Sequence, residues 1–391
     1  MDRKRVLFLP QWIDFDVERG ILDYAREAGW QLISISDHGG DSMPVLRSCP
    51  AIDGIITLIK YGDSDLAQHV AGSLIPVVEL AETVPSIDVP RVVLDHNAIG
   101  QLGANHLLDH GLEHFVFPHF QDHYQLVARG NGFRDHVRAC GGTIHDINLP
   151  EAGLGLTDRD RSEERIPWLA DQLSKLPKPI GLMLHYDSVY WMIVDACKIA
   201  GLRIPEDIAV VSVGNTESVC ELTNPTLSSI EHNQTLQGYR AAWLLDALID
   251  GAHPPDENLR IPPSFVAVRE STDILAVPDD TLRQALKFLR EHFDDPRLCV
   301  DDVVSATGTS KRGLYSLFHD HWHQSIKHTL TSFRIEEAKR LLADTELKAY
   351  VVAMQTGFGS QAQFIRAFRK DVGMPPSEFR DAVRGSSVVH H

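Results

Sequence analysis

Two short segments near the C-terminus carry side chains that could bind a nucleic acid. Both place basic, amide and hydroxyl groups at the outward positions of an apolar-patterned stretch. Arginine and glutamine can pair bidentately with guanine or adenine edges, and lysine contacts phosphates. The candidate DNA-binding residues are Ser310, Lys311, Arg312 and Tyr315 in the first segment and Ser360, Gln361, Gln363, Arg366 and Lys370 in the second.

A short helix and a glycine-containing turn are predicted before each of these segments. Residues 300–306 form the first such helix and Leu347–Gln355 the second, from apolar residues at i, i+3 and i+4 spacing. Ser310 and Ser360 are then expected to cap the helices that follow. A helix, a tight turn and a second helix make a helix-turn-helix, whose second helix can enter a major groove. Ordinary helical hairpins with solvated faces are the alternative interpretation.

The charge distribution favours the DNA-binding interpretation. The chain of 391 residues has 37 Lys and Arg against 54 Asp and Glu, for a net charge of −17. Residues 281–391 hold 16 basic and 13 acidic residues, which leaves residues 1–280 with a net charge of −20. Because an acidic body repels a polyanion, contact with nucleic acid should fall to the C-terminal segment.

A second set of polar residues follows apolar, β-rich runs or opens helices in the first 275 residues. Carboxylates, amides and an arginine beside an aromatic ring suit a sugar, since they pair with hydroxyl groups while the ring stacks on C–H faces. Helix capping or turn formation is the alternative for each, and we favour it for Asp95 and Asn215. The candidate effector-binding residues are Gln11, Trp12, Asp14, Asp16, Asp95, Arg129, Asp187, Asn215 and His232.

The elements around these residues alternate between strands and amphipathic helices. Apolar strands separated by helices predict βαβ units and parallel sheets covered on both faces. The pattern starts again after Asp109-His110-Gly111, which predicts two lobes, about 1–110 with 231–252 and about 111–230 with 253–275. Ligands of such sheets bind at the carboxyl ends of the strands, here between the lobes. After this body of residues 1–275, residues 281–384 show helical patterns only.

Four motifs in the C-terminal segment have a linked spacing: Arg334–Leu342, Val352–Phe358, Ser360–Lys370 and Gly373–Arg380. With them, residues 281–384 resemble the DNA-binding domain of AraC-type transcription regulators. The resemblance implies two helix-turn-helix units that read successive major-groove segments on one face of DNA. Ser316 and His319 stand at positions that are often basic in this family.

Three further motifs lie in the body: Asp95–Leu108, Gly201–Val211 and Gly238–Ala242. They resemble the LacI-type sensor domain, which has the two-lobed periplasmic-binding-protein fold. A sensor followed by an AraC-type domain resembles the bacterial xylose-operon regulators. That resemblance implies a cytoplasmic, nucleoid-associated homodimer that activates transcription and binds operator DNA and D-xylose, with RNA polymerase as a further partner. Relatives commonly have Asp at the position of Gly214 and often Gln at that of His232.

Two alternatives stay open at this point. The same DNA reader could carry a body that binds another small molecule, such as a nucleoside, or only protein partners. An enzyme is disfavoured, because no paired acid–base or nucleophile spacing supports one. No cofactor or metal is expected: the histidine clusters at 319–323 and near His119 lack a Cys pair or an HExxH motif. No apolar run could span a bilayer, and five scattered cysteines indicate a reducing compartment.

Overall fold

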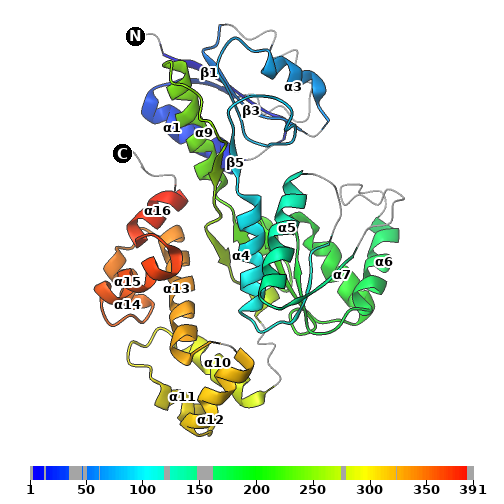
Figure 1. The fold of residues 1–391 in the computed structure, drawn as a ribbon, viewed down its shortest axis with the longest axis vertical. Coiled ribbons are helices and arrows are strands. Elements are labelled where there is room, and N and C mark those ends of the chain that lie inside the picture. Colours follow the sequence, from blue (N-terminus) through cyan, green and yellow to red (C-terminus); the bar gives the residue numbers. More distant parts are fainter. Residues whose placement is uncertain are drawn as a thin grey trace.

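A computed structural model describes residues 3–12, 15–34, 46, 51–60, 62–118, 124–147, 162–273, 279–322 and 324–384. Figure 1 shows an α/β body of two lobes and a helical domain beside it. The predicted fold class is confirmed, since both lobes are built on sheets whose strands run mostly parallel.

The first lobe is a four-stranded parallel sheet in the order β2-β1-β3-β4. The two central strands, β1 and β3, are short apolar runs that are buried on both faces, as is usual for parallel sheets covered by helices. Helix α1 covers the sheet with Val17, Ile21 and Ala25, one buried stripe at helical spacing. The elements are β1 Arg5–Pro10, α1 Phe15–Ala28, β2 Gln31–Ser34, β3 Gly54–Leu58, α3 Ser64–Ala71 and β4 Val77–Glu79.

The second lobe is a six-stranded sheet in the order β12-β10-β9-β8-β6-β7. All of its pairings are parallel except that of β12, Phe265–Ala267, which runs antiparallel to β10, Ser228–Glu231. The other strands are β6 His114–Val116, β7 Thr143–His145, β8 Ile180–Met183 and β9 Ile208–Val213. The helices and turns are α5 Tyr124–Ala139, α6 Ser162–Ser174, η2 Asp187–Val189, α7 Tyr190–Ala200, α8 Glu217–Cys220 and η3 Glu270–Thr272.

The lobes are joined through a two-stranded parallel ribbon of β5, Val92–Leu94, and β11, Leu259–Ile261. Helix α9, Gln234–Ile249, returns to the first lobe and packs on α1. Helix α4, His96–Leu108, packs instead on α5 and on the second sheet. The lobe boundary predicted near residue 110 is therefore wrong, and the first lobe ends with β5. The sequence-based boundary was placed at the end of α4, whereas the chain crosses to the second lobe before this helix.

Glycines set how closely the paired helices approach. A Cβ atom on Gly100 of α4 would collide with the backbone oxygen of Arg129, and one on Gly132 of α5 with that of Asn97. The two helix backbones therefore touch at glycines, a contact that no other residue permits. This crossing holds α5, and with it Arg129, against the start of α4.

The helical domain contains two small cores connected by α13, Ile326–Asp344. One core gathers Leu286, Leu314 and Phe318, and the other gathers Val352, Phe364 and Phe368. Residues of α13 pack into both, so this helix links the two cores. The remaining elements are α10 Asp280–Glu291, α11 Val300–Thr307, α12 Lys311–Leu317, η4 Phe318–Trp322, α14 Ala349–Gln355, α15 Gln361–Val372 and α16 Pro376–Arg384.

Candidate effector pocket and DNA-binding surface

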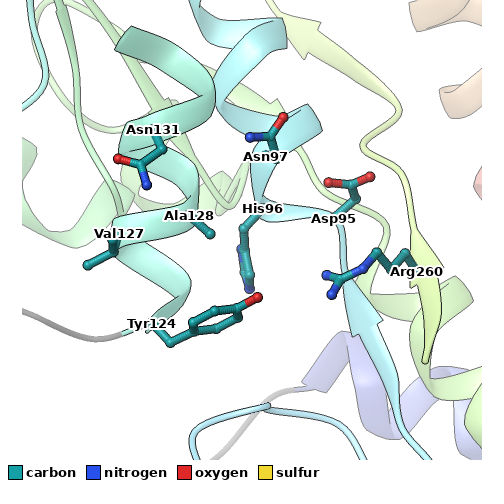
Figure 2. Close-up of a pocket in the computed structure, with 8 residues that line it drawn as sticks. All are labelled: Asp95, His96, Asn97, Tyr124, Val127, Ala128, Asn131 and Arg260. Atoms are coloured by element: carbon teal, nitrogen blue, oxygen red, sulfur yellow. The ribbon is translucent and has the colours of Figure 1, made fainter. Parts of the chain in front are cut away.

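A pocket of about 480 Å³ lies where β5 leads into α4, beside the N-terminal half of α5. Its size falls within the usual range for small-molecule sites. Figure 2 shows Tyr124 of α5 reaching toward His96 at the start of α4, with Asp95 and Arg260 on the side away from α5. The lining residues are Asp95, His96, Asn97, Tyr124, Val127, Ala128, Asn131 and Arg260.

Arg129 lies behind this pocket and is 2% exposed. Its Nη1 donates to the backbone oxygen of His185 at 2.5 Å, and its Nη2 lies 3.2 Å from His96 Nδ1. Burial and the arginine charge hold the pKa of His96 well below its ordinary value, so the ring is neutral. Because a guanidinium only donates, His96 Nδ1 accepts and the ring proton lies on Nε2. The Nε of Arg129 has no hydrogen-bond partner among the described residues.

His232 is the second buried polar group of this region. Burial, and next the charge of Arg129, lower its pKa to about 3, so its ring is also neutral. Its Nδ1 has no hydrogen-bond partner among the described residues. Buried polar atoms without hydrogen bonds are costly. Arg129 Nε and His232 Nδ1 therefore mark a place where a ligand could supply the missing partners.

Asp187 is held rigidly at the carboxyl end of the second sheet. One oxygen accepts from Ser229 Oγ at 2.6 Å, and the other accepts from the Thr216 backbone N–H at 2.8 Å. Gly214 has φ +131°, and a Cβ there would lie 2.8 Å from Asp187 Oδ2. A larger residue at 214 would therefore need a different backbone and a displaced Asp187. Burial lowers the pKa of Arg129, and the negative charge of Asp187 opposes this effect in part.

Asn215 has the turn-forming role that we favoured for it. Its φ of 52° is left-handed, a region that asparagine tolerates well. Its backbone N–H donates to Ser229 Oγ at 2.9 Å, and its Oδ1 accepts from Arg269 Nη2 at 3.0 Å. Asp95 likewise caps α4, with Oδ1 accepting from the Ala98 N–H at 2.9 Å, while it also lines the pocket.

Gln11, Trp12 and Asp16, which follow the first strand, do not line this pocket. The Gln11 side chain donates to Asp63 at 2.5 Å and accepts from the Lys60 N–H at 2.6 Å, which ties two loops of the first lobe together. Trp12 is 38% exposed. Asp16 is exposed at the start of α1. Burial raises the pKa of Glu231, and the negative charge of Asp16 raises it further. Asp14 lies outside the described residues.

Four polar or aromatic lining residues were missed from sequence: His96, Tyr124, Asn131 and Arg260. His96 directly follows Asp95, and Tyr124 and Asn131 are seven residues apart on α5, a spacing that places them on one helix face and was an available signal. Arg260 had none, because it lies on β11, a three-residue strand without an apolar run.

The two helix-turn-helix units have the local structure that the sequence predicts. Ser310 accepts from the Gly313 N–H at 3.0 Å, and Ser360 accepts from the Gln363 N–H at 3.3 Å. Both serines therefore cap the recognition helices α12 and α15. The other candidate DNA-binding residues are all exposed: Lys311, Arg312, Tyr315, Gln361, Gln363, Arg366 and Lys370.

The helical domain is docked on the body through an apolar and a polar contact. Phe265 of β12 belongs to the core of the second helix-turn-helix unit, whereas its neighbour Val266 faces the core of the body. Arg290 of α10 contacts Asp273 at 2.6 Å and His110 Nε2 at 3.2 Å. Strand β12 is thus shared by both domains.

Comparison with known families defines the class of this protein. Residues 104–272 match the periplasmic binding protein-like domain, and residues 303–382 match a helix-turn-helix domain. The chain is therefore a DNA-binding transcription regulator with a periplasmic-binding-protein-like body, and it is not an enzyme.

Its relatives are regulators of sugar operons. The chain is 28% identical over 340 residues to the xylose operon regulatory protein of Haemophilus influenzae, covering 84% of this chain and 85% of that one. Over 102 residues, 26% of this chain and 35% of the relative, it is 31% identical to the arabinose operon regulatory protein of Escherichia coli.

Solved structures show the same fold. The structure of the xylose-binding transcription activator XylR aligns with a TM-score of 0.59 and 24% identity, covering 97% of this chain and 98% of that one. A ribose operon repressor from Lactobacillus acidophilus aligns with a TM-score of 0.55 and 18% identity, covering 70% of this chain and 100% of that one. Within the part of the chain that the structure describes, no helix is long and apolar enough to cross a membrane, and no cluster of side chains suits a metal ion.

Proposed function

We propose that this protein is a sugar-responsive activator of a pentose catabolism operon, with D-xylose as its effector. The observation that carries the proposal is the buried pair of unpartnered atoms, Arg129 Nε and His232 Nδ1, behind a polar pocket in a DNA-binding regulator. Sugar hydroxyls both donate and accept, so they suit a guanidinium and neutral imidazoles equally. The names of the xylose operon relatives support the choice of sugar.

The proposal divides the chain into a sensor, residues 1–275, and a DNA reader, residues 281–384. Asp187 and Asn215 belong to the effector region, together with Arg129 and His232. The protein acts as a homodimer in the cytoplasm, at operator DNA and alongside RNA polymerase. The names of the relatives, an operon regulatory protein and a transcription activator, support the role at operator DNA.

A continuous polar chain supports coupling between sensor and reader. From Asp187 it passes through Ser229 and Asn215 to Arg269, whose backbone N–H donates to Ser228 Oγ at 2.7 Å. Ser228 and Thr272 share a hydrogen bond of 2.6 Å.

From Thr272 the chain continues to the reader. His106 Nε2 lies 2.9 Å from Thr272 Oγ1, His110 Nδ1 donates to the His106 oxygen at 2.6 Å, and Arg290 contacts His110 Nε2. An effector that shifts the end of the second sheet would thereby bias how α10 is held. The free energy of this shift equals the difference in effector binding free energy between the two arrangements of α10.

The test is a thermal-unfolding panel of pentoses, hexoses and nucleosides at millimolar concentration. Ligand bound only by the folded state raises Tm by mass action. We expect D-xylose to raise Tm and Arg129→Lys to abolish the rise, since a lysine cannot reproduce the guanidinium contacts. Arg138→Lys is the matched control, because Arg138 is an exposed residue of the same helix.

Other outcomes select the alternatives. A rise with a nucleoside alone would replace the sugar by that ligand. A flat panel, with DNA binding intact, would favour regulation by protein partners.

A further inference from the structure

The two helix-turn-helix units can be compared position by position within this chain. In each unit a left-handed glycine follows the first helix within two residues, Gly308 with φ 65° and Gly357 with φ 72°. Each recognition helix begins after a capping serine. Counting from those serines, the buried residues coincide: Leu314 with Phe364 and Phe318 with Phe368. Positions at equal distance from the cap are therefore equivalent in the two units.

At three equivalent exposed positions the charge differs in sign or is lost. The second unit carries Arg366, Arg369 and Lys370 on α15. The first unit carries Ser316, His319 and Asp320 in their places. The Asp320 carboxylate accepts from Ser316 Oγ at 2.8 Å and lies 2.7 Å from His319 Nδ1, so this face of the first recognition segment is organised around an acid.

The first helices of the two units differ in the same direction. Asp301 and Asp302 occupy the first turn of α11, whereas α14 has no acidic residue there and Lys348 stands at its N-cap. The N-terminus of a helix attracts phosphate through its free N–H groups and its dipole. The two carboxylates at the start of α11 oppose that attraction.

The candidate phosphate contact of the first unit already has an anionic partner. Lys311 Nζ lies 2.9 Å from Asp301 Oδ1, across the turn that joins α11 to α12. The two side chains are 53% and 73% exposed, so this ion pair is weak and exchanges with other anions. A DNA phosphate that binds Lys311 must displace the carboxylate and then remain close to its charge.

We propose that the two units grip DNA unequally: the second unit anchors the phosphate backbone, and in the first unit Asp301 competes with phosphate for Lys311. The inference rests on the DNA-binding function proposed above. It assigns to Asp301 the role of a negative determinant of affinity.

The test measures binding of the full-length protein to a labelled random-sequence duplex by fluorescence anisotropy, over salt from about 50 to 200 mM. We expect Asp301→Asn to bind about two- to fivefold more tightly at the low-salt end, because repulsion is removed and Lys311 is released. The slope of the logarithm of affinity against the logarithm of salt concentration should steepen by up to about one, for one further counterion released. Lys370→Ala should weaken binding and make the slope shallower, whereas Lys311→Ala should have little effect.

Asp195→Asn is the matched control, because Asp195 forms a similar exposed ion pair with Lys198 on α7 of the body. Unchanged or weaker binding by Asp301→Asn would overturn the inference, and so would a loss in Lys311→Ala as large as that in Lys370→Ala. Absence of any binding by the wild-type chain would instead overturn the proposed function, and the inference with it. Thermal melts of each variant check that the fold is retained.

Discussion

At the scale of single residues, the buried histidines near Arg129 decide how the sensor responds to pH. His232 is neutral in the folded protein because its pKa is lowered to about 3, against an ordinary value of 6.5. Between these two values the unfolded chain binds a proton that the folded chain does not. Stability is therefore fully present above pH 6.5 and is lost as pH falls toward 3.

Replacing His232 by Gln should flatten this dependence. The amide keeps a polar group but does not titrate, so the slope between about pH 4 and 6.5 should fall by up to about 1.4 kcal/mol per pH unit. Urea unfolding at several pH values measures the slope. Equal slopes in the wild type and the variant would show that folding does not lower the pKa of His232.

At the scale of elements, β12 is the strand that joins the two domains. Its residues alternate between partners, as successive strand residues must: Phe265 points into the reader and Val266 into the sensor. A three-residue strand at the edge of the second sheet thus contributes to two hydrophobic cores.

Phe265→Ala should separate the reader from the sensor. Removing a buried phenyl ring leaves a cavity and costs about 3–5 kcal/mol. We expect a new, earlier unfolding transition of the helical domain, seen by calorimetry. Val266→Ala is the control on the same strand, and it should weaken the sensor without splitting the transition. A single transition in both variants would contradict the assignment of β12 as the joint.

At the scale of the whole molecule, the polar chain from Asp187 to Arg290 predicts how effector and DNA communicate. Arg290 connects α10 to both Asp273 and His110, so it joins the reader to the end of that chain. Coupling of two sites is a free energy that both ligands share.

Arg290→Ala should reduce this coupling while both binding activities remain. The ratio of operator affinity with and without D-xylose should move toward one, and the xylose-induced rise in Tm should persist. Arg283→Ala, on the same helix in an exposed ion pair with Asp280, is the control and should keep the wild-type ratio. A wild-type ratio in Arg290→Ala would remove this contact from the coupling.

The sequence by itself determined the elements that depend on neighbouring residues. The two helix-turn-helix units were predicted with their caps, because Ser310, Gly308, Ser360 and Gly357 act within a turn of their own position. Most strands of the two sheets were likewise predicted from short apolar runs, whereas β7 and β12 were not. Local hydrogen bonds and side-chain periodicity suffice for such elements.

Only the tertiary structure decided the pocket and the lobe boundary. Residues of the pocket come from α4, α5 and β11, and β11 pairs with β5 although Leu259 and its partner Val92 are 167 residues apart in the sequence. Among the predicted effector residues that the structure describes, Asp95 alone lines the pocket, while Arg129 lies behind it. The physical reason is that long-range strand pairing and helix crossings at Gly100 and Gly132 bring these side chains together, and no local pattern encodes such distances.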